Sequence, residues 1–125
     1  MDVFIDQVLQ KKQTAICCYN DIIAQKAIEV LLQKGIRVPE EISVTGFDGS
    51  ELSRLTAMYY LGHTTGEISN KIGGLATVTH PCAKMGRQSV ETLFQLINGV
   101  LTEEKAAIEM MPEFQDGRSL GKVKM

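Results

Sequence analysis

The chain has 125 residues, of which 44% are hydrophobic and 22% charged, and its formal net charge is −2. These values are typical of a folded globular domain and exclude a disordered or fibrous chain. The basic residues form no stripe, which argues against a nucleic-acid-binding module. No apolar run reaches the roughly 18 residues needed to span a bilayer, and the first residues lack the pattern of a signal peptide. We therefore expect a cytoplasmic protein without membrane contact.

The chain contains three cysteines, Cys17, Cys18 and Cys82. Cys17 and Cys18 are adjacent in a predicted strand, so their side chains point to opposite faces of a sheet. An odd number at this spacing predicts neither a disulfide framework nor a thiolate metal site. We favour buried structural thiols over a redox or metal role, and we predict no metal and no cofactor.

The first half of the chain has the pattern of a β-α-β unit. Residues 2–12 have helical periodicity, and the apolar run 14–19 (TAICCY) is typical of a strand buried on both faces. Asn20 or Asp21 then caps an amphipathic helix that ends just before Gly35, a residue that adopts positive φ without strain.

A second strand is predicted over residues 42–47 (ISVTGF), after a turn at Pro39. Strand, helix and strand with short connections predict parallel pairing and a right-handed crossover. The predicted fold class is therefore α/β, a Rossmann-like lobe in which a parallel sheet is the middle of three layers.

The second half of the chain is less regular. Residues 49–74 have no clear period, and they form either a functional loop or an element without a readable pattern. A third strand is predicted over 75–79, and a strongly amphipathic helix over 82–98. Residues 105–111 favour a strand, and the polar tail 116–125 is expected to fray.

Asn20 and Asp48 directly follow the first two predicted strands, and open α/β sheets bind small ligands at such strand ends. An amide and an ionised carboxylate together offer the donors and acceptors that vicinal sugar hydroxyls need. From spacing alone we favour the simpler interpretation, in which Asn20 is a helix cap and Asp48 begins a turn. Asp21 fits a cap or structural role better than a ligand role. His80, after the third strand, fits a ligand contact and a backbone contact equally well.

No motif for nucleophilic, metal or phosphate chemistry is present, so no catalytic residue and no enzymatic activity are predicted. A phosphotransfer enzyme with Asp48 as nucleophile is the least favoured alternative, because its further acidic residues and lysine cannot be located. For His63 we favour solvent exposure. For Tyr59 and Tyr60 we favour a local hydrophobic cluster over stacking on a ligand.

Two stretches carry a family resemblance: YNDIIAQKAIEVLLQKGIRVPEEISVTGFD over residues 19–48, and LATVTHPCAKMGRQSVETLFQLINGV over residues 75–100. Both resemble the effector-binding domain of the LacI/GalR family of repressors. The THP crossover is most like the arabinose-repressor branch, in which such a domain follows a GntR-type winged helix. The resemblance implies a periplasmic-binding-protein-like type I fold, in which two α/β lobes close over a sugar.

The resemblance also implies roles for three residues. Asn20 matches an Asn that contacts ligand, and Asp48 matches the Asp of the G-[FY]-D motif, which accepts hydrogen bonds from sugar hydroxyls. His80 lies where the last crossover often reaches the ligand. The family usually has a second Asp after that motif, and here Gly49 replaces it.

Against the family pattern, the chain is expected to be an incomplete, C-terminal fragment. Residues 1–79 would belong to the C-terminal lobe and residues 80–125 to the N-terminal lobe, whose sheet is missing. The apolar stripe of the helix over 82–98 would then be uncovered, unless the helix folds back on the chain's own sheet or the chain dimerises. With half a site, the fragment is expected to bind sugar weakly or not at all.

The predicted function is the sugar-sensing part of a bacterial-type transcriptional repressor that responds to a pentose such as L-arabinose. Operator DNA would be bound through an absent N-terminal DNA-binding domain, and a homodimer is expected. The alternative is a sugar-binding protein of a transport system with the same fold.

Overall fold

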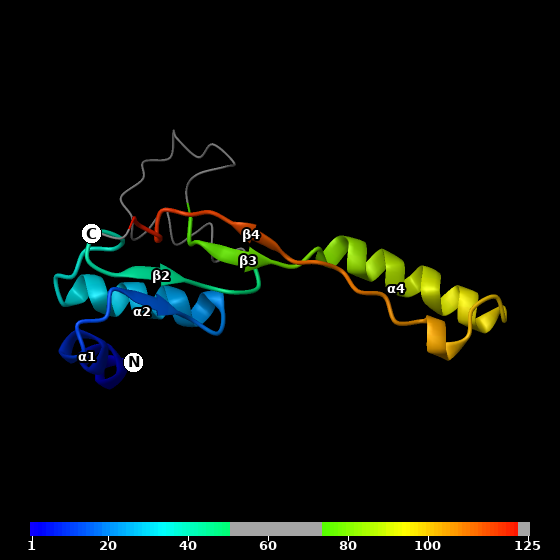
Figure 1. Cartoon of the computed structure of the whole chain (residues 1–125), viewed down its shortest axis with the longest axis horizontal. Coiled ribbons are helices and arrows are strands. Elements are labelled where there is room, and N and C mark those ends of the chain that lie inside the picture. Colours follow the sequence, from blue (N-terminus) through cyan, green and yellow to red (C-terminus); the bar gives the residue numbers. More distant parts are fainter. Residues whose placement is uncertain (51–73, 123–125) are drawn as a thin grey trace. The chain divides into compact units, whose positions relative to one another are not determined.

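The computed structural model describes residues 1–50 and 74–122 (Figure 1). The interpretations of His63, Tyr59 and Tyr60 fall on residues outside these ranges, as does most of the stretch without a readable pattern. No helix in the described part of the chain is long and apolar enough to cross a membrane.

The chain forms two compact units. Unit 1 comprises Met1–Thr79 and Phe114–Met125, and unit 2 comprises His80–Glu113. The sequence predicted a second lobe that includes all of residues 80–125, whereas the structure returns the last residues to unit 1. The match between these units and the lobes of a two-lobed protein stays a prediction.

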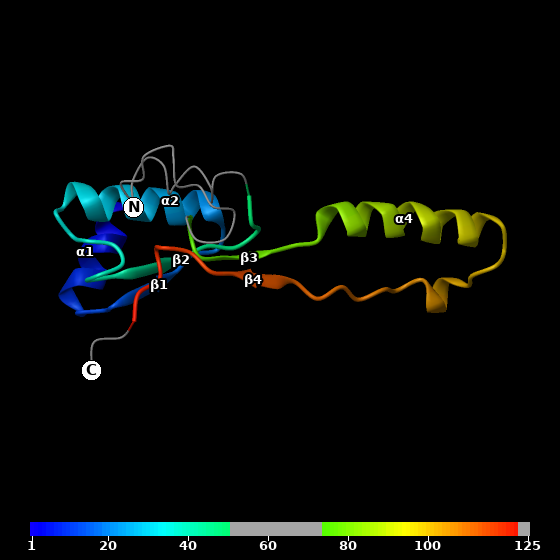
Figure 2. The ribbon, with the colours of Figure 1, turned by 90° about the horizontal axis from the view of Figure 1, so that it is seen from above.

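Unit 1 is built on a small parallel sheet with helices packed against it (Figures 1 and 2). Its elements, with the boundary strand β4 included, are α1 (Asp2–Gln10), β1 (Ala15–Cys17), α2 (Asp21–Gln33), β2 (Ser43–Thr45), β3 (Thr77–Thr79) and β4 (Glu113–Gln115). β1 and β2 pair in parallel over their whole length. Parallel bridges from Thr45 to Ala76 and from Asp48 to Thr79 place β3 next to β2, and β4 pairs with β3. The predicted β-α-β unit and α/β class are confirmed.

The core lies between the sheet and α2, which runs along one face of β1 and β2 (Figure 2). The apolar positions of α2 recur at helical spacing, so one side of the helix is buried while the other is solvated. A salt bridge of 2.9 Å between Lys34 and Asp6 links α2 to α1. The buried core residues that these elements share include Ile5, Val8, Ile16, Ala24, Ala27, Ile28, Leu31, Val44 and Leu75.

The C-terminal tail is ordered against the sheet, and the prediction that it frays is wrong for its described residues. Ser119 is fully buried, and its Oγ donates to the Val44 carbonyl oxygen at 2.6 Å and accepts from the Ala76 N–H at 2.9 Å. The Ser119 carbonyl oxygen accepts from the Val44 N–H at 2.8 Å. Gly117 packs so closely on the backbone of Gly74 and Ala76 that no Cβ would fit. The tail therefore occupies the position beside β2 that lies before β3 begins.

Unit 2 consists of α4 (Cys82–Ile97), a single 3-10 turn η1 (Glu103–Lys105) and a segment that returns to β4. The prediction of a strand over residues 105–111 is wrong. η1 occupies its start, and residues 106–112 have no strand partner in the described part of the chain. The strand forms later, as β4, where β3 supplies a partner.

The apolar stripe of α4 is exposed, because no residue of this helix is buried. The described residues therefore do not bury the stripe, and its coverage by the chain's own sheet stays a prediction. Dimerisation through this face stays a prediction. The exposed fractions are 44% for Met85, 54% for Val90, 55% for Leu93, 61% for Phe94 and 70% for Ile97.

The cysteines are not the buried thiols that the sequence favoured. Cys17 and Cys82 are exposed, Cys18 is half-buried, and all three are free. β1 has an exposed–buried–exposed pattern rather than burial on both faces, because alternate side chains face opposite sides of the sheet and only Ile16 faces the core. Burial, reinforced by the neighbouring Cys17, raises the pKa of Cys18 to about 11.

Cys18 is therefore expected to react with thiol reagents much more slowly than the other two cysteines. At pH 8 a thiol with a pKa of about 11 is ionised in roughly one molecule in a thousand, and the thiolate is the reactive form. Ellman's reagent should label Cys17 and Cys82 in a fast phase and Cys18 in a slow one. The variant Cys18→Ala should lose only the slow phase, and equal labelling of all three thiols in the folded protein would contradict the burial of Cys18.

The variant Ser119→Ala is expected to lower the free energy of unfolding by about 1–3 kcal/mol, because it leaves two buried backbone groups without their partner. Urea denaturation followed by circular dichroism measures the change. Ser89→Ala is the matched control, since Ser89 Oγ donates to the Met85 carbonyl oxygen at 2.8 Å on the exposed side of α4. Equal stabilities of the two variants would show that Ser119 does not join the tail to the sheet.

Candidate functional site

Asn20 and Asp48 lie beside each other at the carboxyl end of the parallel sheet. Asn20 follows β1 and Asp48 follows β2, just past the point where the two paired strands end. The segments that follow the two strands stay adjacent there, because the Asp21 N–H donates to the Phe47 carbonyl oxygen at 3.0 Å. Asp48 is exposed and Asn20 is half-buried. The structure therefore brings these two predicted residues together at an edge that solvent reaches.

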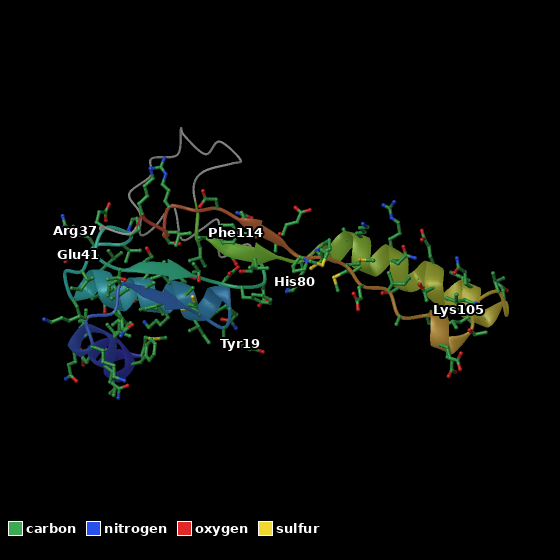
Figure 3. The ribbon with its side chains drawn as sticks, viewed as in Figure 1. Tyr19, Arg37, Glu41, His80, Lys105 and Phe114 are labelled. Carbon is green, nitrogen blue, oxygen red and sulfur yellow. The ribbon has the colours of Figure 1, made fainter. Side chains whose placement is uncertain are left out.

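The side chain of Asn20 caps α2, which confirms the helix-cap interpretation. Its Oδ1 accepts from the Ile23 N–H at 2.9 Å. The Nδ2 group has no partner among the described residues, so its two hydrogens are available as donors. Tyr19, the preceding residue, is 84% exposed at the end of β1 (Figure 3). A capping role thus uses only one half of the Asn20 amide.

The turn after β2 contains two successive residues with positive φ, Asp48 at 93° and Gly49 at 64°. For a residue with a side chain this conformation costs about 1–2 kcal/mol, and such strain gathers at functional sites. At Gly49 a Cβ would lie 2.8 Å from both the Cα and the Cβ of Thr79. The turn as built here therefore requires glycine at the position where the resembling family has a second Asp.

Asp21 is the buried polar centre of this region, with an exposed fraction of 1%. Its Oδ2 accepts from the N–H of Ser50 at 2.6 Å and from the Oγ of Ser50 at 2.9 Å. Its Oδ1 accepts from the Thr77 Oγ1 at 2.6 Å. We call these three residues the Asp21 network. The structural role predicted for Asp21 is confirmed, whereas Ser50 and Thr77 carried no signal in the sequence, because neither follows a motif.

Gly46 is the close neighbour of the Asp21 network. A Cβ at this position would overlap the Oδ1 of Asp21 and would lie 2.7 Å from the Cδ2 of Leu75. The backbone of β2 therefore approaches α2 at a distance that only glycine permits. This close approach brings the start of α2 and the end of β2 together, and with them Asn20 and Asp48.

His80 is the first residue of unit 2 and is half-buried. Its chain neighbour Thr79 pairs with Asp48, and its carbonyl oxygen accepts from the Cys82 N–H at 2.8 Å where α4 begins. Asn20 and Asp48 thus lie on adjoining segments of unit 1, and His80 lines a cavity of about 510 Å³ within unit 2. The other cavity walls come from α4 and the return segment: Met85, Gln88, Ser89, Thr92, Leu93, Leu96, Ala106, Ile108 and Met110.

The Asn20–Asp48 pair is suited to neutral polar ligands rather than to metals. Among residues 1–50 and 74–122, no group of three or more His, Cys, Asp or Glu side chains is arranged to hold a metal ion. An amide that donates beside a carboxylate that accepts matches the hydroxyl groups of a small polyol or sugar. Both residues project from a rigid sheet end, which fixes their geometry before a ligand arrives.

Unit 1 thus combines a parallel sheet with polar residues at its carboxyl end, and the chain leaves it after β3 and returns at β4. Residues 1–120 match the family model of the periplasmic binding protein-like domain, and the chain belongs to this family. Within it, the chain resembles the effector-binding domains of LacI-family regulators.

Relatives and solved structures support this assignment. The HTH-type transcriptional repressor PurR of Aliivibrio fischeri is 34% identical over 113 residues, which cover 87% of this chain and 29% of that protein. The arabinose metabolism transcriptional repressor of Geobacillus stearothermophilus is 31% identical over 110 residues, 88% of this chain and 26% of that protein. A LacI family transcriptional regulator from Arthrobacter sp. FB24, solved with lactose, has the same fold with a TM-score of 0.74 at 22% identity, over 96% of this chain and 39% of that one. This chain thus spans less than a third of the length of these curated relatives.

The variant Gly46→Ala is expected to lower the free energy of unfolding by about 1–3 kcal/mol, because the new methyl group displaces Asp21 and Leu75. Gly86→Ala is the matched control. Gly86 lies within α4, and an added methyl group there would meet nothing within 4 Å, so alanine should add about 0.5–1 kcal/mol through helix propensity. Urea denaturation measures both. A Gly46→Ala protein as stable as the unsubstituted one would contradict the close approach of β2 to Asp21.

Proposed function

We propose that this chain is the sugar-sensing, effector-binding portion of a LacI-family transcriptional repressor. The whole protein would act in the cytoplasm as a homodimer that binds operator DNA through another domain. The observation that carries the proposal is the Asn20–Asp48 pair at the carboxyl end of the sheet. The repressor relatives and the lactose-bound structural neighbour support it.

The chemistry of the pair favours a sugar as effector. Asp48 is exposed and carries a carboxylate, a group that accepts hydrogen bonds from hydroxyl groups. Asn20 offers its Nδ2 hydrogens as donors, because its Oδ1 is already bonded to the Ile23 N–H. A vicinal diol, which both donates and accepts, satisfies the two side chains together.

A pentose such as L-arabinose is the finer proposal. It rests on the Thr79-His80-Pro81 crossover, which resembles that of the arabinose-repressor branch, and on the arabinose metabolism repressor among the relatives. The PurR relatives, whose sequence identity to this chain is similar, do not support arabinose as the effector. We include His80 in the site as the residue through which the crossover would approach the sugar. No catalytic residue is proposed.

The sensor would act by differential binding. A sugar that contacts Asn20 and Asp48 more favourably in one lobe arrangement than in another shifts the population toward the first. A DNA-binding domain linked to the lobes would then respond to that shift. A transport protein of the same fold is the alternative, and the repressor relatives argue against it.

The variant Asp48→Asn is expected to weaken L-arabinose binding by roughly 10- to 100-fold, because a hydrogen bond to a charged group contributes about 1.5–3 kcal/mol. Asparagine keeps the size of the side chain and tolerates positive φ, so the turn is retained. Isothermal titration calorimetry of the protein that carries this chain measures the affinity. Asp6→Asn is the matched control, since Asp6 lies on α1 and pairs with Lys34.

The same titration distinguishes the parts of the proposal. A protein that binds none of L-arabinose, D-xylose and lactose would contradict sugar sensing. Tighter binding of lactose than of either pentose would contradict the pentose assignment alone. Equal affinities of the Asp48→Asn and Asp6→Asn variants would remove Asp48 from the site.

A further inference from the structure

We propose that Asp21 is the positioning residue of the effector site. Its buried side chain would hold the turn from Phe47 to Ser50 in the strained conformation that presents Asp48 to a ligand. This proposal rests on the proposed function, because only an effector site gives the position of Asp48 a role. The contacts that carry it are nevertheless those of the described residues alone.

Asp21 binds the turn on both sides of Asp48. Its backbone N–H donates to the Phe47 carbonyl oxygen at 3.0 Å, one residue before Asp48. Its Oδ2 accepts from the N–H of Ser50 at 2.6 Å and from the Oγ at 2.9 Å, two residues after Asp48. The positive φ of Asp48 is thus enclosed between two attachments to a single residue. Strained backbone persists only where its surroundings determine it in this way.

The second carboxylate oxygen ties the same residue to β3. Oδ1 accepts from the Thr77 Oγ1 at 2.6 Å, and Thr77 is fully buried. β3 in turn pairs with the turn through the bridge from Thr79 to Asp48. The start of α2, the turn after β2 and the strand that precedes His80 therefore share one anchoring group.

The charge of Asp21 is compensated locally. Burial of a carboxylate is unfavourable unless hydrogen bonds replace its hydration. Here three donors, the N–H and Oγ of Ser50 and the Oγ1 of Thr77, replace that hydration. Asp21 is also the first residue of α2, where the helix dipole favours a negative charge. The carboxylate has no room to shift, because Gly46 leaves no space for even a methyl group beside it.

The turn itself provides the first test, which needs no effector. Amide hydrogen exchange of the 125-residue chain, followed by NMR, is compared for Asp21→Asn, Thr77→Val and Ser119→Ala. Asp21→Asn should lower the protection of the Ser50 amide at least tenfold relative to that of Ala76. Ser119→Ala should instead lower the protection of the Ala76 amide relative to that of Ser50, because the Ala76 N–H loses its acceptor, Ser119 Oγ. Unchanged Ser50 protection in Asp21→Asn would overturn the proposal.

Effector affinity provides the second test, and Thr77 keeps it informative if Asp21→Asn fails to fold. Thr77→Val removes one donor from the Asp21 network, and Thr77→Ser retains it. L-arabinose affinity of the protein that carries this chain should fall at least tenfold in Thr77→Val and recover in Thr77→Ser. Ser119→Ala should leave the affinity within about twofold.

The outcomes separate a positioning role from a structural one. If Thr77→Val and Ser119→Ala reduce affinity to the same extent, Asp21 serves stability alone and the proposal is overturned. If the unsubstituted protein binds no sugar, the proposed function fails, whereas the exchange measurement still decides whether Asp21 holds the turn.

Discussion

The buried carboxylate of Asp21 is the constraint on which the rest of unit 1 depends. Its side chain joins the start of α2, the turn after β2 and the strand β3. A buried charge of this kind requires all of its donors, because a lost partner leaves the carboxylate without either hydration or hydrogen bonds. The position of the Asn20–Asp48 pair follows from it, since both residues flank backbone that Asp21 holds.

The other end of β2 is completed by the C-terminal tail. Ser119 hydrogen-bonds Val44 and Ala76 where β3 has not yet begun. The middle of the sheet is therefore formed by segments that are far apart in the chain, with unit 2 inserted between β3 and the tail. One chain segment therefore leaves unit 1 after β3 and another returns to it at β4.

The sequence predicted the parts of this arrangement that depend on residues close together in the chain. Apolar runs with a capped amphipathic helix between them predicted the β-α-β unit, and residues at strand ends predicted the Asn20–Asp48 pair. The predictions failed where the burial of a residue depends on segments that are far away in the chain. Ser119 is polar and lies in a polar tail, yet it is fully buried, and its hydroxyl bonds the backbone of Val44 and of Ala76. Cys17 is exposed, although its apolar run suggested burial, because it lies on the face of β1 opposite to the one on which Ile16 joins the core.

By itself the sequence determined the α/β class, the family and the identity of the polar pair, because periodicity, caps and motifs are properties of neighbouring residues. Only the tertiary structure decided that Asp21, Ser50 and Thr77 form one hydrogen-bonded group, that Gly46 and Gly49 are required by close approach, and that the tail completes the sheet. These depend on which backbone groups lie within hydrogen-bonding distance after folding. That distance is set by the packing of α2 on the sheet and not by any local pattern of residues.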